Sequence, residues 1–379
     1  MYLTTERGIE DIVAQDLKLS FNVDAKLLGF RGKVFTQGDE DLIFMLNFAA
    51  RSINRVVILL AKCEVGALTE IRDIVNDIDW SLYINRKQTF AVRAERVGKH
   101  NFTSMDIARE VGATVIENCE RSYKEKLKVN LKKPDVIIIA ELINSKFLLG
   151  IDTTGASLHM RRYRVYNHPM PLRTTIAYLL VRLSNWEGSG ILLDPMCGGG
   201  TIPIEASLYA RKIPIVNFRK SEYAFYKLRF LDLEKASKIQ NKLLNDAQWN
   251  LKLNVYGMDI NKKHIKGAKM NAKSAGVDDT ITFFHGDARR LSEYFPDESI
   301  DAIISNPPYK LPDKDKLSRL YHKFLININK KLRSGGRAVI ITSEIGLMRR
   351  KLKENKIRYK ERIVFRYGSL YAGIFIISK

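Results

Sequence analysis

From about residue 173 onward, short apolar segments alternate with longer amphipathic ones, and this alternation constrains the possible folds most strongly. The apolar segments are GILLD, NVYGMDI, TITFFHGD, IDAIIS and GRAVIITS. Segments with helical spacing, such as TIPIEASLYARK and KLSRLYHKFLININKKLRS, lie between them. Strands that alternate with helices form a mostly parallel sheet covered on both faces. We therefore predict an α/β domain over residues 173–379, and YKERIVFRYGSLYAGIFIISK predicts a closing β-hairpin.

The first 155 residues predict two small α+β units, over residues 1–62 and 63–155. In the first, MYLTT, DAKLLGF, GKVFTQG and RVVILLAKCEV predict strands, whereas GIEDIVAQDLKLS and EDLIFMLNFAARS predict helices. In the second, SMDIAREVGATVIENCER predicts a helix, and QTFAVRAERV and DVIIIAELINSKFLLGID predict strands, the latter two strands around Asn144–Ser145. Residues 156–172 are basic, aromatic and proline-bearing, which is typical of a linker.

The chain carries a large positive charge. Lysine and arginine number 63 against 42 acidic residues, which gives a formal net charge of +21. An excess of this size favours a polyanionic partner, because phosphates are bound largely through counterion release. A lysine-rich solvated surface, as in proteins from hot environments, is the alternative that charge alone leaves open.

Other features of composition indicate a cytoplasmic protein. The longest apolar runs fall short of the ~18 residues that a membrane span needs, and the charged start MYLTTERGIEDIV is unlike a signal peptide. Cys63, Cys119 and Cys197 are far apart without C-x-x-C spacing. This argues against a zinc site or a disulfide framework, so we predict no metal site and a reducing compartment.

A glycine-rich loop, LLDPMCGGGT at residues 192–201, follows the first strand of the α/β region. In a parallel sheet this turn lies where ligands bind, and glycines allow close approach to the backbone. The lysine of a phosphate-binding P-loop is absent, as is the G-x-G-x-x-G pattern of dinucleotide sites. The loop therefore predicts a ligand without a pyrophosphate, with a tight strand–helix turn as the alternative.

Acidic residues end the next two predicted strands. Asp259 lies in GMDI and Asp287 in HGDA. A carboxylate at the second strand end commonly binds ribose hydroxyls. Asp259 lies much farther from the glycine loop than the ~20 residues usual for dinucleotide sites, so residues 211–250 are predicted to be an insertion with helices of their own. Each acid alone could be a helix cap, but two acids in register with the loop favour a ligand site.

The stretch SNPPYK, residues 305–310, closes the predicted strand IDAIIS. Proline lacks an N–H donor, so this loop exposes carbonyl acceptors on a stiff backbone. Asn306 adds a side-chain acceptor and Tyr309 adds an aromatic face. Such a site suits a planar base whose exocyclic amine donates to the Asn306 oxygen and the Pro307 carbonyl, with the ring stacked on Tyr309. A Pro-Pro turn that merely ends the strand is the alternative.

Together these motifs resemble the class I S-adenosylmethionine-dependent methyltransferases with an N-P-P-Y motif, which methylate amino nitrogens. TERGIEDI, FAVRAERVGKHNFTSMDIAREVG and IDTTGASLHMRRYR are similar to the ferredoxin-like region and THUMP domain of RNA methyltransferases. HPMPLRTTIAYLLVRLS and DPMCGGGTIPIEA are similar to the THUMP-linked guanine-N2 enzymes. The resemblance spans almost the whole chain and is closest to the enzymes that make N2-methylguanosine at position 6 of tRNA.

This resemblance implies a Rossmann-like methyltransferase domain over residues 173–379, with a mostly parallel seven-stranded sheet, after a ferredoxin-like domain and a THUMP domain. It implies S-adenosylmethionine as cofactor and the tRNA acceptor stem and 3′ end as partner, with no obligatory protein partner evident. The cofactor residues it implies are Asp194, Met196, Cys197, Gly198, Gly199, Gly200 and Thr201 for the methionine part, Asp259 and Ile260 for the ribose, Asp287 and Ala288 for the adenine, and Asn306. The residues that would hold the target base are Asn306, Pro307, Pro308 and Tyr309.

Two basic groups are predicted to contact RNA. One lies in the THUMP-like unit and the other in the linker, where Tyr163 and Tyr166 are interleaved with the cations. The residues are Arg93, Arg96, Lys99 and His100 in the first group and Arg161, Arg162 and Arg164 in the second. A solvated basic face is the alternative.

Several other functions share parts of this pattern. Guanine-N2 methylation at another tRNA or rRNA position fits every motif. DNA adenine-N6 methyltransferases share N-P-P-Y without the THUMP-like half, and a protein glutamine methyltransferase does not explain the charge. A non-catalytic RNA-binding scaffold does not explain the four loop motifs. Cytosine-C5 methylation needs a nucleophilic cysteine beside the target base, whereas Cys197 lies in the predicted cofactor loop.

Overall fold

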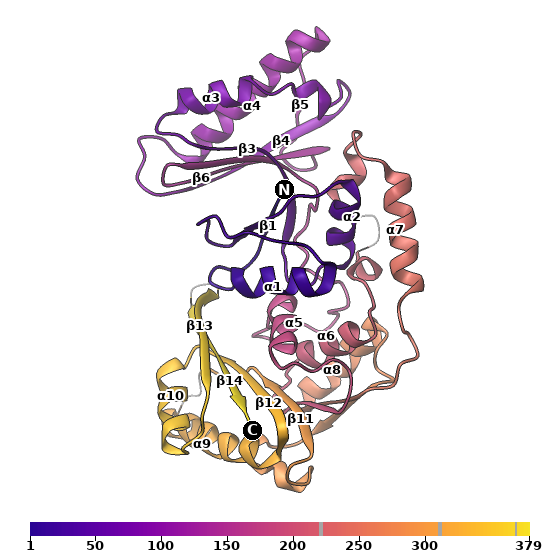
Figure 1. The fold of residues 1–379 in the computed structure, drawn as a ribbon, viewed down its shortest axis with the longest axis vertical. Coiled ribbons are helices and arrows are strands. Elements are labelled where there is room, and N and C mark those ends of the chain that lie inside the picture. The colour runs from indigo at the N-terminus through magenta and orange to yellow at the C-terminus, as the bar shows by residue number, and fades with distance from the viewer. Residues whose placement is uncertain (220–222, 310–312, 368–369) are drawn as a thin grey trace.

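Two seven-stranded sheets organise the chain, one in each half (Figure 1). The computed structural model describes residues 1–219, 223–309, 313–367 and 370–379. The N-terminal sheet has the order β2-β1-β3-β7-β6-β4-β5. Its strands are β1 (Tyr2–Thr4), β2 (Lys33–Phe35), β3 (Arg55–Glu64), β4 (Thr89–Val97), β5 (Lys128–Val129), β6 (Val136–Ile143) and β7 (Lys146–Asp152). Its helices are α1 (Glu10–Phe21), α2 (Glu40–Ala49), α3 (Leu68–Asn76), η1 (Trp80–Leu82) and α4 (Ser104–Tyr123).

The two units predicted in this half share that one sheet. Strand β3 pairs with β1 on one side and β7 on the other, so the predicted boundary between residues 62 and 63 falls inside a strand. The strand predicted for DAKLLGF is wrong, because only Lys26 forms an isolated bridge, to Phe35. Two leucines of that segment are exposed rather than buried in a sheet face, and Gly29 turns the chain with a φ of +76°.

The C-terminal sheet is mostly parallel, as predicted, with the order β10-β9-β8-β11-β12-β14-β13. Its strands are β8 (Ile191–Asp194), β9 (Asn254–Asp259), β10 (Ile281–His285), β11 (Ile300–Ser305), β12 (Leu332–Thr342), β13 (Lys360–Tyr367) and β14 (Leu370–Ser378). Strand β14 runs antiparallel to both of its neighbours and forms the predicted hairpin with β13. The strand order reverses between β8 and β11, and ligands bind at such a switch point.

Helices cover this sheet on both faces. They are α5 (Thr174–Leu183), α6 (Thr201–Ala210), α8 (Lys262–Ala275), η4 (Ala288–Glu293), α9 (Lys314–Lys331) and α10 (Ile345–Glu354). The helices η2 (Ile215–Phe218), η3 (Ala224–Lys227) and α7 (Leu233–Asn245) lie between α6 and β9 and contact α2 and β6 of the N-terminal half instead. The 211–250 insertion therefore has helices of its own, as expected. None of the helices in the part of the chain that the structure describes is long and apolar enough to span a membrane.

The insertion joins the two halves of the molecule. Phe225 of η3 packs edge-on against Phe44 and Phe48 of α2, with ring centroids 5.1 and 5.4 Å apart. The Asp232 N–H, just before α7, donates to Glu40 Oε2 at 3.2 Å. Aromatic packing of this kind fixes the insertion against the N-terminal half.

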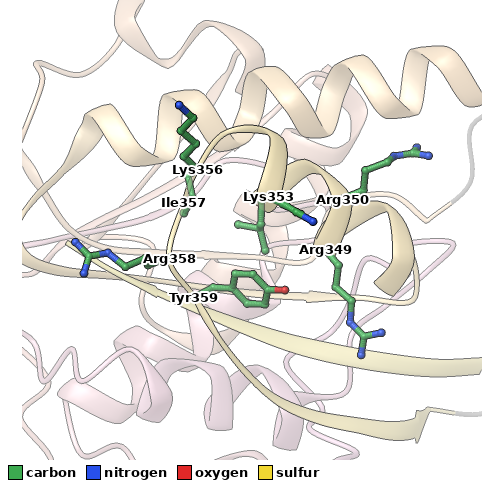
Figure 2. A pocket seen from close by; sticks show the side chains of 8 residues that line it. Arg349, Arg350, Lys353, Lys356, Ile357, Arg358 and Tyr359 are labelled. Carbon is green, nitrogen blue, oxygen red and sulfur yellow. The ribbon is translucent and has the colours of Figure 1, made fainter.

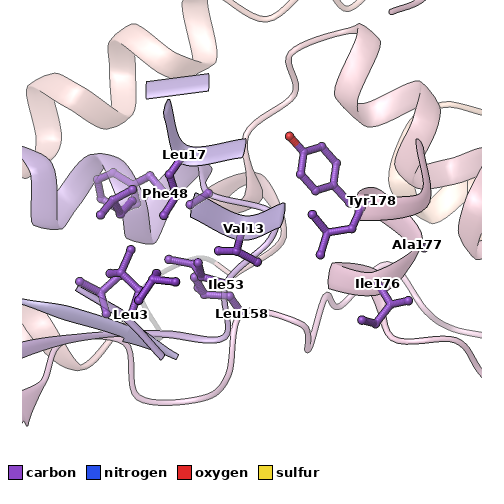
Figure 3. Close-up of a cluster of buried hydrophobic side chains, with 14 of the residues drawn as sticks. Leu3, Val13, Leu17, Phe48, Ile53, Leu158, Ile176, Ala177 and Tyr178 are labelled. Atoms are coloured by element: carbon purple, nitrogen blue, oxygen red, sulfur yellow. The ribbon is translucent and has the colours of Figure 1, made fainter. Parts of the chain in front are cut away.

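One hydrophobic core runs through both halves. Figure 3 shows side chains of the N-terminal sheet and α1, such as Val13 and Leu17, packed near Tyr178 of α5, and all three belong to the same buried cluster. The predicted linker contributes Leu158 to that cluster. Because a shared core resists separation of its parts, the N-terminal sheet and the C-terminal sheet are packed as one body.

A buried ionic group also connects the halves. Glu205 of α6 pairs with Arg161 and accepts a hydrogen bond from the Tyr163 hydroxyl at 2.7 Å. Arg51, at the end of α2, lies 3.8 Å from the same carboxylate, and its guanidinium donates to the Leu208 carbonyl at 3.1 Å. Burial lowers the pKa of Arg51, and these bonds hold the linker between the two halves.

Candidate active site

A cleft of about 480 Å³ opens at the carboxyl ends of β8, β9 and β11, where the strand order reverses. Loops after four strands and the linker form its walls. The predicted residues that line it are Asp194, Met196, Cys197, Gly198, Gly199, Thr201, Asp259, Ile260, Asp287, Ala288, Asn306, Pro307, Pro308 and Tyr309. The fold therefore brings together motifs that are up to 115 residues apart in the chain, from 194 to 309.

The glycine loop is fixed from behind by backbone bonds. The Cys197 N–H donates to the Met258 carbonyl of β9 at 2.8 Å. Gly198 takes a φ of +52°, and a Cβ there would lie 3.1 Å from the His168 ring. Gly200 does not line the cleft, although a direct cofactor role was predicted. A Cβ on Gly200 would lie 3.0 Å from both Ala268 and Phe283, so this glycine lets the loop pack closely against its neighbours.

Asp194 is buried at the end of β8. Its Oδ1 accepts hydrogen bonds from the Met196 N–H at 3.2 Å and the Ser305 hydroxyl at 3.3 Å. Burial raises the pKa of Asp194 to about 8, although the bond from Met196 opposes the rise. The negative charge of Asp259 adds to it. The free protein therefore holds Asp194 protonated at neutral pH.

Asp259 ends β9 and connects two loops. Its Oδ2 accepts the Gly198 N–H at 2.9 Å, and its Oδ1 accepts the Asn261 N–H at 2.8 Å. The His264 ring nitrogen lies 3.4 Å from Oδ1, and the His264 ring stands edge-on to His168 at 4.4 Å between centroids. The carboxylate thus holds the glycine loop in place and also faces the cleft.

Asp287 follows β10 and is held by its neighbour. The Arg289 Nε donates to both carboxylate oxygens at 2.9 Å. Burial alone would raise the pKa of Asp287, but hydrogen bonds from Arg289 outweigh it and lower the pKa below its usual value. Asp287 is therefore ionised at neutral pH, unlike Asp194.

The N-P-P-Y loop follows β11 directly. The Tyr309 hydroxyl donates to Asn306 Oδ1, which orients the amide. The Tyr321 hydroxyl of α9 donates to the Pro308 carbonyl at 3.3 Å. Among the described residues, no donor lies within hydrogen-bonding distance of the Pro307 carbonyl. Tyr309 is only 7% exposed, so most of the ring on which stacking was predicted is covered in this state.

Cys197 is not a nucleophile in this structure. Its side chain is buried, and burial, with the charges of Asp194 and Asp259, raises the pKa of the thiol well above its usual value. Since the thiolate is the reactive form, the group is inert. A buried, protonated thiol does not support the cytosine-C5 chemistry that needs a nucleophilic cysteine.

Sequence reasoning missed part of the cleft wall. The additional residues are His168, Met170, Pro171 and Leu172 of the predicted linker, Ile202, Asn261 and His264, and Arg289, Lys316 and Leu320. The linker segment HPMPL, residues 168–172, is not part of a strand. Its sequence pattern therefore gave no position relative to the sheet and did not predict that it lines the cleft. The prolines and methionine in a basic segment were the available signal.

A buried amide clamps the linker beside the cleft. The Tyr166 N–H donates to Asn271 Oδ1 at 2.8 Å, and Asn271 Nδ2 donates back to the Tyr166 carbonyl at 3.2 Å and to the Gly199 carbonyl at 2.9 Å. The Tyr166 ring fills the space above Gly267, where a Cβ would lie 2.2 Å from it. Asn271 therefore ties the linker and the glycine loop together.

The predicted RNA contacts divide into two outcomes. The predicted RNA contact of Arg161 is wrong. Its side chain is buried and paired with Glu205, so the guanidinium is not presented to RNA. Arg164 is half-buried and donates to the Leu172 carbonyl, whereas Arg162 is exposed.

The group in the THUMP-like unit remains on the surface of β4 and the turn that follows. Arg93 donates to the Leu131 carbonyl, and Arg96 donates to the Gly98 carbonyl at 2.8 Å. His100 lies 2.7 Å from the Asn144 carbonyl, and Lys99 is exposed. Figure 1 places β4 in the half of the molecule away from the C-terminal sheet, next to α3 and α4, which form the far end.

Comparison with protein families matches the two halves separately. A family model described as the RMKL-like methyltransferase domain matches residues 161–372, and a THUMP domain model matches residues 67–152. The chain is 39% identical to a tRNA (guanine(6)-N2)-methyltransferase of Methanocaldococcus jannaschii, over 100% of this chain and 99% of the relative. It is 38% identical to the enzyme of the same name from Archaeoglobus fulgidus, over 99% of this chain and 91% of the relative.

The fold also matches a solved structure along its whole length. A possible methylase from Clostridium difficile 630 superimposes with a TM-score of 0.87 and 28% identity. The match covers 100% of this chain and 97% of that one. The arrangement of both sheets is therefore shared with the structure of that possible methylase.

Proposed function

Since the chain belongs to the family of RMKL-like methyltransferases with a THUMP domain, we propose that it methylates the exocyclic N2 of a guanosine in tRNA. The proposed target is position 6, in agreement with the names of the two archaeal relatives. We further propose S-adenosylmethionine as the donor and the acceptor stem as the place of the target. The observation that carries the proposal is that Asn306 and Pro307 enter the same cleft as Asp194, Asp259 and Asp287.

The cleft fits the proposed cofactor in size and chemistry. Its volume of about 480 Å³ is in the range of small-molecule sites. Asp194 and the glycine loop would hold the methionine part, with Asp259 near the ribose and Asp287 with Ala288 near the adenine. When bound, S-adenosylmethionine supplies a methyl group that its sulfonium makes electrophilic. Pro171 and Leu172 add apolar walls that exclude water.

The N-P-P-Y loop is suited to orient an amine. Asn306 Oδ1 has two lone pairs, so it can accept an amine hydrogen while it keeps the bond from Tyr309. The Pro307 carbonyl would accept the second hydrogen. These two acceptors aim the nitrogen lone pair and stabilise the positive charge that develops on nitrogen, so that no strong base is needed. The proton is released after transfer.

A guanine inside a stem cannot reach these acceptors while it is stacked. It must be flipped out, at a cost of a few kcal/mol. Tyr309 lines the cleft beside Asn306 and would receive the base after a shift that exposes more of its ring. The THUMP-like group, with Arg93, Arg96 and Lys99, would hold the 3′ end and set the distance to the target.

The direct test is to map the methylated product. The protein is incubated with labelled S-adenosylmethionine and tRNA, duplex DNA or a protein mixture, and the products are digested and analysed by mass spectrometry. We expect N2-methylguanosine at position 6, and loss of the label when that pair is changed to adenosine–uridine. Methylated adenine in DNA or methylglutamine in protein would contradict the proposal. A label on another guanosine of the tRNA would show that the target is not position 6.

A further inference from the structure

A strongly basic surface lies outside the cleft, on α10 and the turn that leads into β13. Residues 349–362 contain eight lysines and arginines but only two glutamates. Part of this segment surrounds a hollow of about 580 Å³, which we call the α10 hollow (Figure 2). Its lining residues are Arg349, Arg350, Leu352, Lys353, Lys356, Ile357, Arg358 and Tyr359.

Three cations of the α10 hollow are free to bind an external anion. Arg349 is held by Glu361 through two bonds of 2.7 Å, so it is already neutralised. By contrast, within the described part of the chain no carboxylate lies within 4.0 Å of Lys353, Lys356 or Arg358. All three side chains are exposed. The hollow therefore presents at least three unpaired positive charges.

The end of α10 and the turn after it, which carry these cations, are held in place by buried side chains and hydrogen bonds. Its apolar residues Leu352 and Ile357 are buried, and the Ile357 N–H donates to the Leu352 carbonyl at 3.0 Å. Asn355 Nδ2 donates to the Lys351 carbonyl at 2.8 Å and lies 3.2 Å from the His322 ring nitrogen of α9. A fixed frame lowers the entropy cost of binding, because only side-chain ends need to be ordered.

A path of cations connects the α10 hollow with the cleft. Lys316 of α9 lines the cleft itself. Arg319 and Lys323 follow on the same side of α9, and with Lys351 they line a second hollow of about 180 Å³ between α9 and α10. Arg319 lies 3.8 Å from Asp313, and Lys351 lies 2.7 Å from Glu354, so both are paired. We call the remaining cations, Lys316, Lys323, Lys353, Lys356 and Arg358, the basic track.

The pairing of the strands gives the distance between the α10 hollow and the N-P-P-Y loop, because Lys360 directly follows Tyr359 of the hollow. Lys360 of β13 pairs with Ile376, which pairs with Val339, and Val339 pairs with Ile304 next to the end of β11. Strand β13 thus lies three strand spacings from the strand that carries the N-P-P-Y loop, or about 14 Å. A nucleic-acid stem whose base enters the cleft has phosphates within this distance.

We propose that the basic track binds the phosphodiester backbone of the tRNA stem that carries the target guanosine. The inference rests on the proposed function and locates the part of the stem contact that the catalytic half makes. Phosphate contacts of lysine and arginine fix the register of a protein on a duplex without reading its sequence. With the THUMP-like group in the other half of the molecule, the track would give the RNA a second point of attachment, beside the target base.

The test compares two triple variants that remove the same charge. In one, Lys353, Lys356 and Arg358 are replaced by alanine. In the control, the exposed Lys235, Lys238 and Lys242 of α7 are replaced, because Figure 1 places α7 on the opposite side of the molecule. Binding of unmodified tRNA is measured by fluorescence anisotropy over a series of KCl concentrations, without methyl donor.

We expect the track variant to bind tRNA at least tenfold more weakly, with a slope of log affinity against log salt reduced by about 2–3, or about one per lost phosphate contact. The control should keep the wild-type slope. Equal losses of tRNA affinity in both variants would show an effect of net charge only and would overturn the proposal. An unchanged salt slope in the track variant would also overturn it. Stronger binding of an acidic protein than of tRNA would also overturn it.

A single substitution separates a role in binding from a role in folding. Lys356 has a φ of +55°, which glycine adopts at lower cost. Lys356→Gly should therefore keep or raise the melting temperature while it lowers the salt slope by about one. A lower melting temperature with an unchanged slope would assign Lys356 a structural role instead. Because the readout is binding, failure of methyl transfer by the wild-type protein would contradict the proposed function without deciding this inference.

Discussion

At the scale of single residues, Asn306 carries the largest expected effect on the reaction. Asn306→Ala removes one of two acceptors that orient the amine, while the prolines keep the loop in shape. By analogy with loss of one oxyanion-hole donor, the single-turnover rate should fall about 10²–10³-fold. The measurement uses saturating S-adenosylmethionine and tRNA, with the affinity of each determined separately. A normal rate would show that the amide does not orient the target.

Tyr309 provides the matched pair of variants. Tyr309→Phe keeps the ring but removes the hydroxyl that donates to Asn306. Loss of one neutral hydrogen bond corresponds to about 0.5–1.5 kcal/mol, so the rate should fall roughly tenfold or less. Tyr309→Ala also removes the stacking surface, and its rate should be much lower. Equal inactivity of the two variants would contradict a role for the ring face.

Asp194 predicts a proton linkage. Its pKa of about 8 in the free protein means that the carboxyl is protonated at pH 7, and a cationic ligand group beside it would favour ionisation. Binding of S-adenosylhomocysteine should release about one proton near pH 7, and affinity should rise as pH approaches 8. Calorimetry in buffers of different ionisation enthalpy measures this. Release that persists in Asp194→Asn would assign the proton to another group.

The same shift affects stability. The pKa of Asp194 is higher in the folded chain than its usual value of 3.8, so the folded state binds the extra proton between these values. Its contribution to the free energy of unfolding is therefore fully present at low pH and is lost as pH rises through about 8.

The sequence predicted which polar residues meet in the cleft, because strand ends of a parallel sheet converge. Asp194 and Asp259 end their strands, Asp287 and Asn306 follow theirs, and all four line the cleft. It did not predict that Arg161 is buried, because a cation pattern does not reveal a distant partner such as Glu205. Burial of a charge depends on long-range packing that local spacing does not encode.

At the scale of elements, the segment 166–172 acts as a wall of the cleft. Asn271→Ala would leave the Tyr166 and Gly199 carbonyls without a donor and loosen this wall. Loss of such buried bonds corresponds to about 1–3 kcal/mol, so cofactor affinity should fall about tenfold. Calorimetry checks this, with the exposed Asn241→Ala of α7 as control. Unchanged affinity in a folded Asn271→Ala protein would show that the wall does not shape the site.

Most strands were predictable because their apolar pattern matches their burial. Strands β8 and β11 are short, buried runs that admit one register. The failed strand at residues 24–30 contains two leucines that the structure exposes and a glycine turn. Hydrophobicity alone therefore overestimated the burial of this segment. The turn at Gly29 prevents it from continuing as a strand.

At the scale of the whole molecule, the buried ionic group makes the two halves one folding unit. Glu205→Ala would leave the buried Arg161 and Arg51 without their carboxylate. Breaking a buried pair in this way destabilises a protein by about 3–5 kcal/mol. Urea denaturation should show this loss, whereas Glu187→Ala, which removes a mostly exposed carboxylate 3.8 Å from Arg182, should change little. Two separate transitions in the wild-type protein would contradict a single cooperative unit.

The sharing of one core was not predictable from the sequence. The segment pattern indicated separate units joined by a linker, whereas Leu158 and Tyr163 of that linker are buried. Whether two amphipathic faces cover each other depends on their complementary shapes, which composition does not specify. As a result, the distance between the THUMP-like surface and the cleft is set by packing rather than by linker length.

The central claim is that the cleft methylates the 2-amino group of a guanosine. Inosine differs from guanosine by the absence of that group and keeps its pairing with cytidine, so a tRNA with inosine at position 6 is the most direct test. Single-turnover methyl incorporation is compared between the two tRNAs at equal, saturating occupancy. We predict full incorporation with guanosine and none with inosine. Equal incorporation in both would contradict the assignment of N2 at this position as the acceptor.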